Sequence, residues 1–225
     1  AEAGDITASD AVTFGANKSG TLTTSGDIDT SNDNVTFTRG VTLGGAVDID
    51  TGTGAGNIVF NSTVATADKN LSLDAGASGN ITLSGALTGG GVLTVRDGKA
   101  QSYQALTVDS LDIQDATTSV TLDGALTTQT TLDINSGGTL TQNKKVIAGT
   151  SLDYDAGGAL TINETIAATT VDIDATGVTT VAEAGDITAS DAVTFGADKS
   201  GTLTTAGEIT TSDDNVTFTN AVTQT

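Results

Sequence analysis

The sequence predicts an all-β protein, a parallel β-helix (β-solenoid) with about 20 residues and three short strands in each turn. Three observations predict this fold. A long stretch of sequence recurs, a shorter period of about 20 residues lies within it, and the expected strands alternate apolar and polar residues. At about 20 residues per turn, the 225 residues would make roughly eleven turns.

The long repeat is the clearest of these signals. Residues 1–44 return as residues 182–225, at an offset of 182 − 1 = 181 residues, and nine of the 44 overlapping positions differ. We interpret residues 1–225 as one continuous solenoid, with a long repeat unit over residues 1–181 and the start of a second copy over residues 182–225. Because unpaired strand edges at the ends of a solenoid favour association, we expect adjacent repeat units of the same protein or end-to-end self-association as partners.

The shorter period is marked by strands with an apolar centre between polar residues, such as DID. The centres recur about every 20 residues, which predicts about nine turns in the long unit. These centres are Ile6, Ile28, Ile49, Leu73, Val95, Ile113, Ile134, Tyr154, Ile173 and Ile187.

Two further strands are expected in most turns, and three strands per turn give a triangular cross-section. The second strand resembles VTF and begins at Val12, Val35, Ile58, Ile81, Val120, Leu160, Val193 and Val216. The third strand is marked by Leu22, Val41, Val64, Leu87, Leu106, Leu126, Val146 and Ile166. β-Branched residues fill these strands, and Gly, Asn, Asp and Ser fill the corners between them, where tight turns need such residues.

The aromatic residues fall at equivalent positions in the expected strands. All five phenylalanines fall at the last inward position of the expected second strand, so we expect one stacked core column of Phe14, Phe37, Phe60, Phe195 and Phe218. Leu83, Leu122 and Ile162 hold the same position in other turns. Tyr154 is expected in the core, where its hydroxyl needs a partner or a route to the surface, and Tyr103 at a corner.

The composition excludes several classes of function. His, Cys, Met, Trp and Pro are all absent, which excludes His or Cys nucleophiles, zinc sites built on them, and disulfides. Eight Lys+Arg against 28 Asp+Glu give a net charge of −20. Nucleic acid is therefore a poor partner, and no apolar run is long enough to insert into a membrane.

Many of the polar residues beside the first-strand centres are aspartates that point outward, so stacked turns form a ladder of carboxylates. Besides the calcium candidates named below, this ladder includes Asp74, Asp112, Asp133 and Asp186. Two unit charges about 4.8 Å apart in water repel by roughly 0.9 kcal/mol. Two interpretations stay open: a solvated acidic face, or a ladder that binds Ca²⁺. No cofactor is required, and the calcium candidates are Asp27, Asp29, Asp48, Asp50, Asp153, Asp155, Asp172 and Asp174.

Other surfaces suggest alternatives to a purely structural role. A row of outward threonines on the second strand, which includes Thr13, Thr36, Thr82, Thr121, Thr141, Thr161, Thr194 and Thr217, could belong to an ice-binding face. Carbohydrate-cleaving enzymes also use parallel β-helices, but the carboxylates here recur on several turns and mark no single catalytic cleft. The least regular segment, residues 97–104, gathers Lys99 and Tyr103 next to Arg96 and is the best candidate for a special surface.

Turns of about 20 residues with DID, VTF and GxLT elements resemble bacterial filamentous-haemagglutinin-type exoproteins and autotransporter passengers. The stretch GNITLSGALTGGGVLTV, residues 79–95, is similar to the strand repeats of giant surface proteins in that group. The resemblance implies a right-handed β-helix, an extracellular location at a bacterial cell surface, and a role as a stalk or adhesin without catalysis. The alternatives are a module that binds a host or cell-surface glycan or protein and, behind it, a polysaccharide-degrading enzyme or an ice-binding solenoid.

Overall fold

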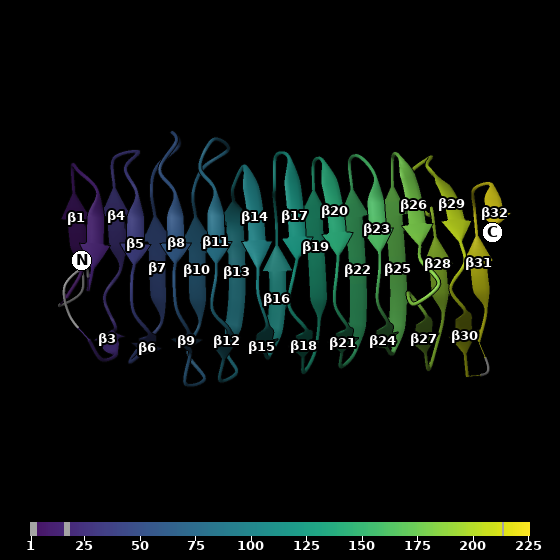
Figure 1. Ribbon diagram of the computed structural model, residues 1–225, viewed down its shortest axis with the longest axis horizontal. Coiled ribbons are helices and arrows are strands. Elements are labelled where there is room, and N and C mark those ends of the chain that lie inside the picture. Colours follow the sequence, from purple (N-terminus) through teal and green to yellow (C-terminus); the bar gives the residue numbers. More distant parts are fainter. Residues whose placement is uncertain (1–3, 16–18, 213) are drawn as a thin grey trace.

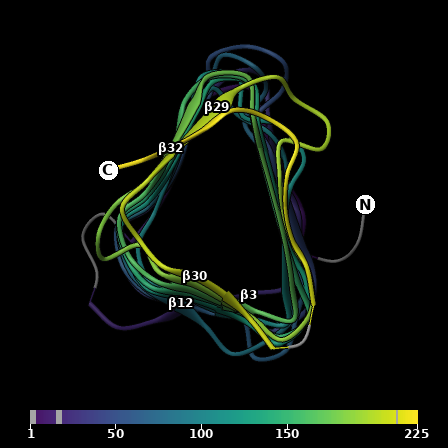
Figure 2. The same ribbon diagram turned by 90° about the vertical axis from the view of Figure 1, so that its right-hand side faces the viewer.

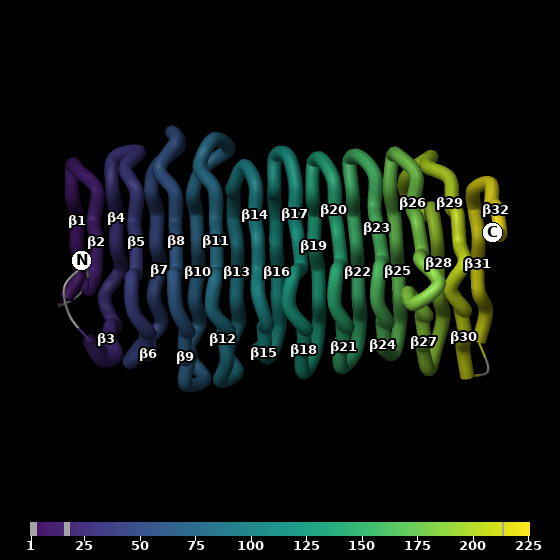
Figure 3. The backbone as a smooth tube through the Cα atoms, viewed as in Figure 1, coloured from purple at the N-terminus to yellow at the C-terminus, as the bar shows by residue number. Residues whose placement is uncertain are grey.

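The computed structural model describes residues 4–15, 19–212 and 214–225, and within these ranges every regular element is a β-strand. The rungs lie side by side along the long axis (Figures 1 and 3). In Figure 2 the chain advances toward the viewer while it turns anticlockwise around a triangular tube, so the solenoid is right-handed. The predicted fold class, with roughly eleven turns, is therefore confirmed. A helix long and apolar enough to cross a membrane is absent from the described ranges.

The strands form three parallel sheets, and each sheet makes one face of the tube. The first sheet contains β1 (Ile6–Ala8), β4 (Ile28–Thr30), β7 (Val47–Asp50), β10 (Leu71–Asp74), β13 (Val92–Asp97), β16 (Ser110–Ile113), β19 (Leu132–Ser136), β22 (Ser151–Ala156), β25 (Thr170–Ala175), β28 (Val193–Phe195) and β31 (Val216–Phe218).

The second sheet contains β2 (Val12–Phe14), β5 (Val35–Phe37), β8 (Ile58–Phe60), β11 (Ile81–Leu83), β14 (Ala100–Tyr103), β17 (Ser119–Leu122), β20 (Thr139–Gln142), β23 (Leu160–Ile162), β26 (Val178–Val181), β29 (Thr202–Thr205) and β32 (Val222–Gln224). The third sheet contains β3 (Leu22–Thr24), β6 (Val41–Leu43), β9 (Val64–Ala65), β12 (Leu87–Thr88), β15 (Leu106–Val108), β18 (Leu126–Thr128), β21 (Val146–Ala148), β24 (Ile166–Ala168), β27 (Ile187–Ala189) and β30 (Ile209–Thr211).

Alternation of apolar and polar residues places one set of side chains inside the tube and the other outside. In β22, for example, Leu152, Tyr154 and Ala156 are buried, while the intervening residues are half-buried. Each strand bonds to the equivalent strands of the turns on either side, so inward side chains stack into columns. One such column in the first sheet joins Ile113, Ile134, Tyr154 and Ile173.

The phenylalanines form two stacks, on different faces, instead of the single predicted column. Phe14, Phe37 and Phe60 stack in the second sheet, with ring centroids 4.7 and 4.5 Å apart. Phe195 and Phe218 stack in the first sheet at 5.5 Å, where Phe195 lies on Ile173. Phe37, Phe60 and Phe195 are buried as expected, and Phe14 is half-buried. Phe218 is 42% exposed, because β31 pairs on one side only, with β28.

The two tyrosines are both fully buried. The expected core position of Tyr154 is confirmed, and its hydroxyl lies 3.4 Å from the Gln142 side-chain oxygen. The prediction that Tyr103 sits at a corner is wrong. Tyr103 ends β14 and stacks between Leu83 and Leu122 in the second sheet, and its hydroxyl donates to Gln101 Oε1 at 2.8 Å. Both glutamines are themselves buried, so each phenol has a polar partner inside the apolar tube.

The long repeat spans close to the predicted nine turns, but it does not contain a whole number of them. Ile6 lies in β1 of the first sheet, whereas Ile187 lies in β27 of the third sheet and pairs with Ile166. From β1 to β27 the chain makes 27 − 1 = 26 strand steps, and three steps make one turn, so the unit spans eight turns and two strands. The short spacing from Ile173 to Ile187 is thus the distance between two faces of one turn.

Candidate functional site

The outer face of the first sheet carries two columns of polar residues, one on each side of the buried centres. The first acidic column runs through Asp27, Asp48, Ser72, Thr94, Asp112, Asp133, Asp153, Asp172 and Thr194, in the register of the strands. The second acidic column contains Asp29, Asp50 and Asp74 at one end and Asn135, Asp155 and Asp174 at the other. Parallel pairing therefore brings carboxylates from distant parts of the sequence into adjacent rungs.

At the N-terminal end of this face the carboxylates accept hydrogen bonds. Asp27 Oδ1 accepts the backbone N–H of Asp48 at 2.8 Å, and Asp50 Oδ1 accepts the N–H of Gly52 at 2.6 Å. Arg96 donates through Nη1 and Nη2 to the two oxygens of Asp48, at 2.8 and 2.7 Å, and through Nε to Asp74 at 3.2 Å. These hydrogen bonds, that to Asp48 above all, raise the pKa of Arg96 above its ordinary value.

Arg96 reaches these carboxylates because its strand contains a β-bulge. Leu73 of β10 pairs with Val95 of β13, but Asp74 pairs with Asp97, so Arg96 is the extra residue on β13. A bulge redirects the side chain of the extra residue. Here the guanidinium extends back across two rungs and covers the acidic face between β7 and β13. Strand periodicity alone does not predict this contact, because the extra residue in LTVRD becomes a bulge only through the pairing of β13 with β10.

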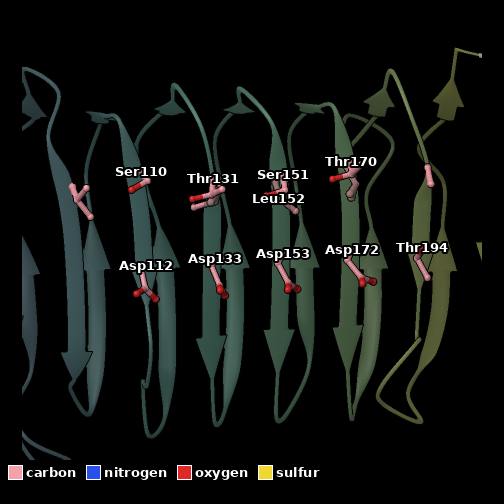
Figure 4. A pocket seen from close by; sticks show the side chains of 14 residues that line it. Ser110, Asp112, Thr131, Asp133, Ser151, Leu152, Asp153, Thr170, Asp172 and Thr194 are labelled. Atoms are coloured by element: carbon pink, nitrogen blue, oxygen red, sulfur yellow. The ribbon is translucent and has the colours of Figure 1, made fainter.

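The C-terminal end of the face is a groove of about 520 Å³ in which like charges are adjacent. Figure 4 shows Asp112, Asp133, Asp153 and Asp172 on four successive strands, in one row. A parallel row of hydroxyls forms the other side of the groove, from Ser110, Thr131, Ser151 and Thr170. The groove is shallow, and each of these four rungs contributes one aspartate and one Ser or Thr hydroxyl to it. Its floor includes Leu132 and Leu152.

Loss of hydration and mutual repulsion raise the carboxylate pKa values in this groove. Burial, followed by the charges of Asp133 and Asp155, raises the pKa of Asp153 to about 6. Burial and neighbouring carboxylates also raise the pKa values of Asp133 and Asp172. Asp172 Oδ1 is buried and has no hydrogen-bond partner among the described residues. Charge is compensated nearby in the second acidic column, where Lys199 lies 3.2 Å from Asp155.

The eight calcium candidates lie on strands of the first sheet and on the corner before β4, in two groups, and Asp174 among them is buried. Asp27, Asp29, Asp48 and Asp50 lie on β4, β7 and the corner before β4, and Asp153, Asp155, Asp172 and Asp174 lie on β22 and β25. Within the described parts of the chain, no three acidic residues converge in an arrangement that could hold a metal ion. The carboxylates are instead spread along the tube, so calcium binding stays a prediction.

Two other predicted surfaces change in the structure. The segment 97–104 does not gather its side chains on one surface, because Arg96 points outward from the first sheet and Tyr103 points into the core. The outer threonine row of the second sheet contains Thr13, Thr36, Thr82, Thr121, Thr141 and Thr161, and Val59 interrupts it. Thr194 and Thr217 are not in this row, since β28 and β31 belong to the first sheet. Asp186 likewise precedes a strand of the third sheet.

Comparison of the chain with protein-family models, with curated proteins and with solved structures finds no match. The site must therefore be interpreted from its own geometry.

Proposed function

We propose that this chain is a structural segment of a long extracellular fibre or adhesin stalk at a bacterial cell surface, which provides spacing, attachment or a matrix and performs no catalysis. The observation that supports this most directly is the continuity of the solenoid across the boundary between the two copies. The first sheet passes from β25 into β28 and β31 with Val171, Val193 and Val216 in register. A unit that joins the next one through ordinary strand pairing can be repeated without a linker.

The interior supports a mechanical role. Buried apolar residues from Ile28 to Leu203 form one continuous core cluster along the tube. Each rung bonds to the next on three faces, so a load along the axis is shared by three parallel sheets. A solenoid of this kind gains stability from nearest-neighbour contacts between turns, and added turns lengthen it without a change of width.

The proposal is tested by proteins that contain one, two or three tandem copies of the 181-residue unit. At about 4.8 Å per turn, each added copy should lengthen the rod by roughly 42 Å at constant width. Electron microscopy of the three proteins measures the end-to-end lengths. Linear growth supports the proposal, whereas a distance that rises only as the square root of the copy number would indicate flexibly linked beads and would refute it.

A glycan- or protein-binding adhesin module is the second candidate, and the groove on the first sheet favours it. Rows of carboxylates and hydroxyls on β16, β19, β22 and β25 offer repeated hydrogen-bonding groups to an extended ligand. Binding of the isolated chain on a glycan array, weakened by Asp133→Asn and Asp153→Asn together, would favour this alternative over a purely mechanical role.

A further inference from the structure

The two copies of the long repeat occupy different faces of the solenoid. Strands β1 to β6 of the first copy correspond in sequence to β27 to β32 of the second. β1 lies in the first sheet, but its counterpart β27 lies in the third. β2 lies in the second sheet and its counterpart β28 in the first, while β3 lies in the third sheet and its counterpart β29 in the second. All six strands therefore move by one face, in the direction opposite to the winding of the chain.

Local hydrogen bonds recur in the two copies, although the copies lie on different faces. In the first copy, the N–H of Asp27 donates to Asp5 Oδ1 at 3.1 Å, and in the second, the N–H of Glu208 donates to Asp186 Oδ1 at 2.8 Å. Thr38 Oγ1 donates to the Phe14 carbonyl at 2.9 Å, and Thr219 Oγ1 donates to the Phe195 carbonyl at 3.0 Å. Equivalent residues thus make equivalent contacts on a different side of the tube.

The solenoid accepts the shift because its three faces present similar short strands to the core. In the first copy, β2 of the second sheet ends at Phe14, and the next strand, β3 of the third sheet, begins at Leu22. In the second copy, residues 196–201 connect β28 of the first sheet to β29 of the second. The face that a segment occupies is therefore set by the number of strands that precede it.

We propose that in a fibre of these units each unit is rotated by one face, about one third of a turn, relative to the unit before it. This inference rests on the proposed function, since it needs tandem units. Three units would make 3 × 26 = 78 strand steps, or 26 complete turns, after which the first face returns. The acidic face of each unit would therefore be displayed on the three sides of the fibre in succession.

This rotation also limits the length of each row of like charges. On the first sheet, the column of Asp112, Asp133, Asp153 and Asp172 ends at Thr194 and Thr217 where the second copy begins. The equivalent of Asp27 in that copy, Glu208, lies beside Asp186 at the third sheet. A partner that recognises the acidic face would meet it from any side of the fibre, once every three units on each side.

The rotation at the junction can be tested in the present chain, which contains no cysteine. Asp172 and Thr194 are partners on adjacent strands of the first sheet, close enough for a disulfide, so the pair Asp172→Cys and Thr194→Cys should cross-link on oxidation. The matched control is Thr180→Cys with Thr194→Cys. These residues would be neighbours if the second copy re-entered on its original face, but Thr180 instead pairs with Thr204. Efficient cross-linking of the control pair alone would overturn the inference.

The rotation along the fibre is tested in a protein of three units with Asp133→Cys and its two counterparts, each labelled with a gold particle. Electron tomography should find labels separated by roughly 42 Å along the axis and by about one third of a turn around it. Straight rods with three labels in line along one side would refute the rotation while leaving the structural role intact. Bent or collapsed particles would refute the structural role itself.

Discussion

The two ends of the acidic face carry similar residues, but the carboxylates at the two ends have different partners. At the N-terminal end, Asp48 and Asp74 bind Arg96, and Asp27 and Asp50 accept backbone N–H groups. At the C-terminal end, four aspartates follow one another on successive rungs, and Asp153 has a pKa raised to about 6. Regular stacking produces both rows, but a guanidinium binds two of the carboxylates at the N-terminal end, while burial and neighbouring carboxylates still raise the pKa of Asp29 there.

The difference shows that the effect of a carboxylate on this fold depends on its partner more than on its place in the repeat. Two charges about 4.8 Å apart repel by roughly 0.9 kcal/mol in water, and by more beside an apolar wall. A single bulge residue, Arg96, offsets this repulsion at Asp48 and Asp74. The same substitution should therefore have opposite effects at the two ends.

The largest effect is expected from Arg96→Met. It removes the charge and the bidentate contact with Asp48, and it leaves Asp48 and Asp74 close together without a cation. We expect a loss of about 2 kcal/mol in the free energy of unfolding at pH 7 and low salt, reduced by added salt. Thermal or denaturant unfolding measures it. Arg39→Met is the matched control, since Arg39 donates one side-chain hydrogen bond within the described residues, to the Ser19 carbonyl at 3.3 Å. Equal losses in both variants would contradict the role assigned to Arg96.

A smaller effect of opposite sign is expected from Asp153→Asn. The folded state raises the pKa of Asp153 from 3.8 to about 6, so the folded protein binds this proton more tightly than the unfolded chain. Its contribution to stability is therefore fully present below pH 3.8 and is lost as the pH rises through 6. Because the side chain is half-buried and partly screened, we expect a gain of about 1 kcal/mol at pH 7.5 and almost none at pH 4.

The control for this substitution is Asp48→Asn, which removes the carboxylate that binds Arg96 and should destabilise the protein at pH 7.5. Unfolding of both variants between pH 4 and pH 8 compares the two ends of the face directly. Loss of stability in both variants at pH 7.5 would show that Asp153 has a stabilising partner that outweighs repulsion.

Much of the fold could be predicted because alternation and period are local signals that persist through every turn. Tyr154 illustrates this, since its place among the first-strand centres predicted both its burial and its need for a polar partner. Tyr103 was missed because AQSY lacks the apolar pattern of its neighbours. Gln101 faces the core there, and hydrogen bonds to the Tyr103 hydroxyl and the Asp115 carbonyl compensate its burial.

The rotation of the second copy could not be predicted from similarity alone. Similar sequence predicts the same face for both copies, so the Phe195 ring is expected on the second strand. The number of strands between the copies decides the face instead. This number is hard to count from the sequence, because β26, with the sequence VTTV, has only a weak apolar pattern. The candidate site follows the same logic: stacking predicted the acidic ladder, but the bulge that moves Arg96 onto it depends on the register of two strands.

The smallest expected effect concerns calcium. If the ladder binds Ca²⁺, the C-terminal group should be responsible, because Asp27, Asp48 and Asp50 already accept hydrogen bonds and the oxygen of Asp172 is unpartnered among the described residues. Carboxylates on successive rungs can share an ion without forming a closed site, so affinity should be low. At a calcium concentration equal to the dissociation constant, the gain would be about 0.4 kcal/mol.

Melting with excess chelator, with millimolar CaCl₂ and with MgCl₂ at the same ionic strength separates binding from screening. A calcium-specific rise that Asp153→Asn and Asp172→Asn abolish, and that Asp27→Asn leaves intact, would assign the ion to the C-terminal group. Equal melting temperatures in CaCl₂ and MgCl₂ would identify the ladder as a solvated acidic face. Its repulsion would then act against lateral pairing of neighbouring fibres, because two such faces cannot approach without bringing like charges together.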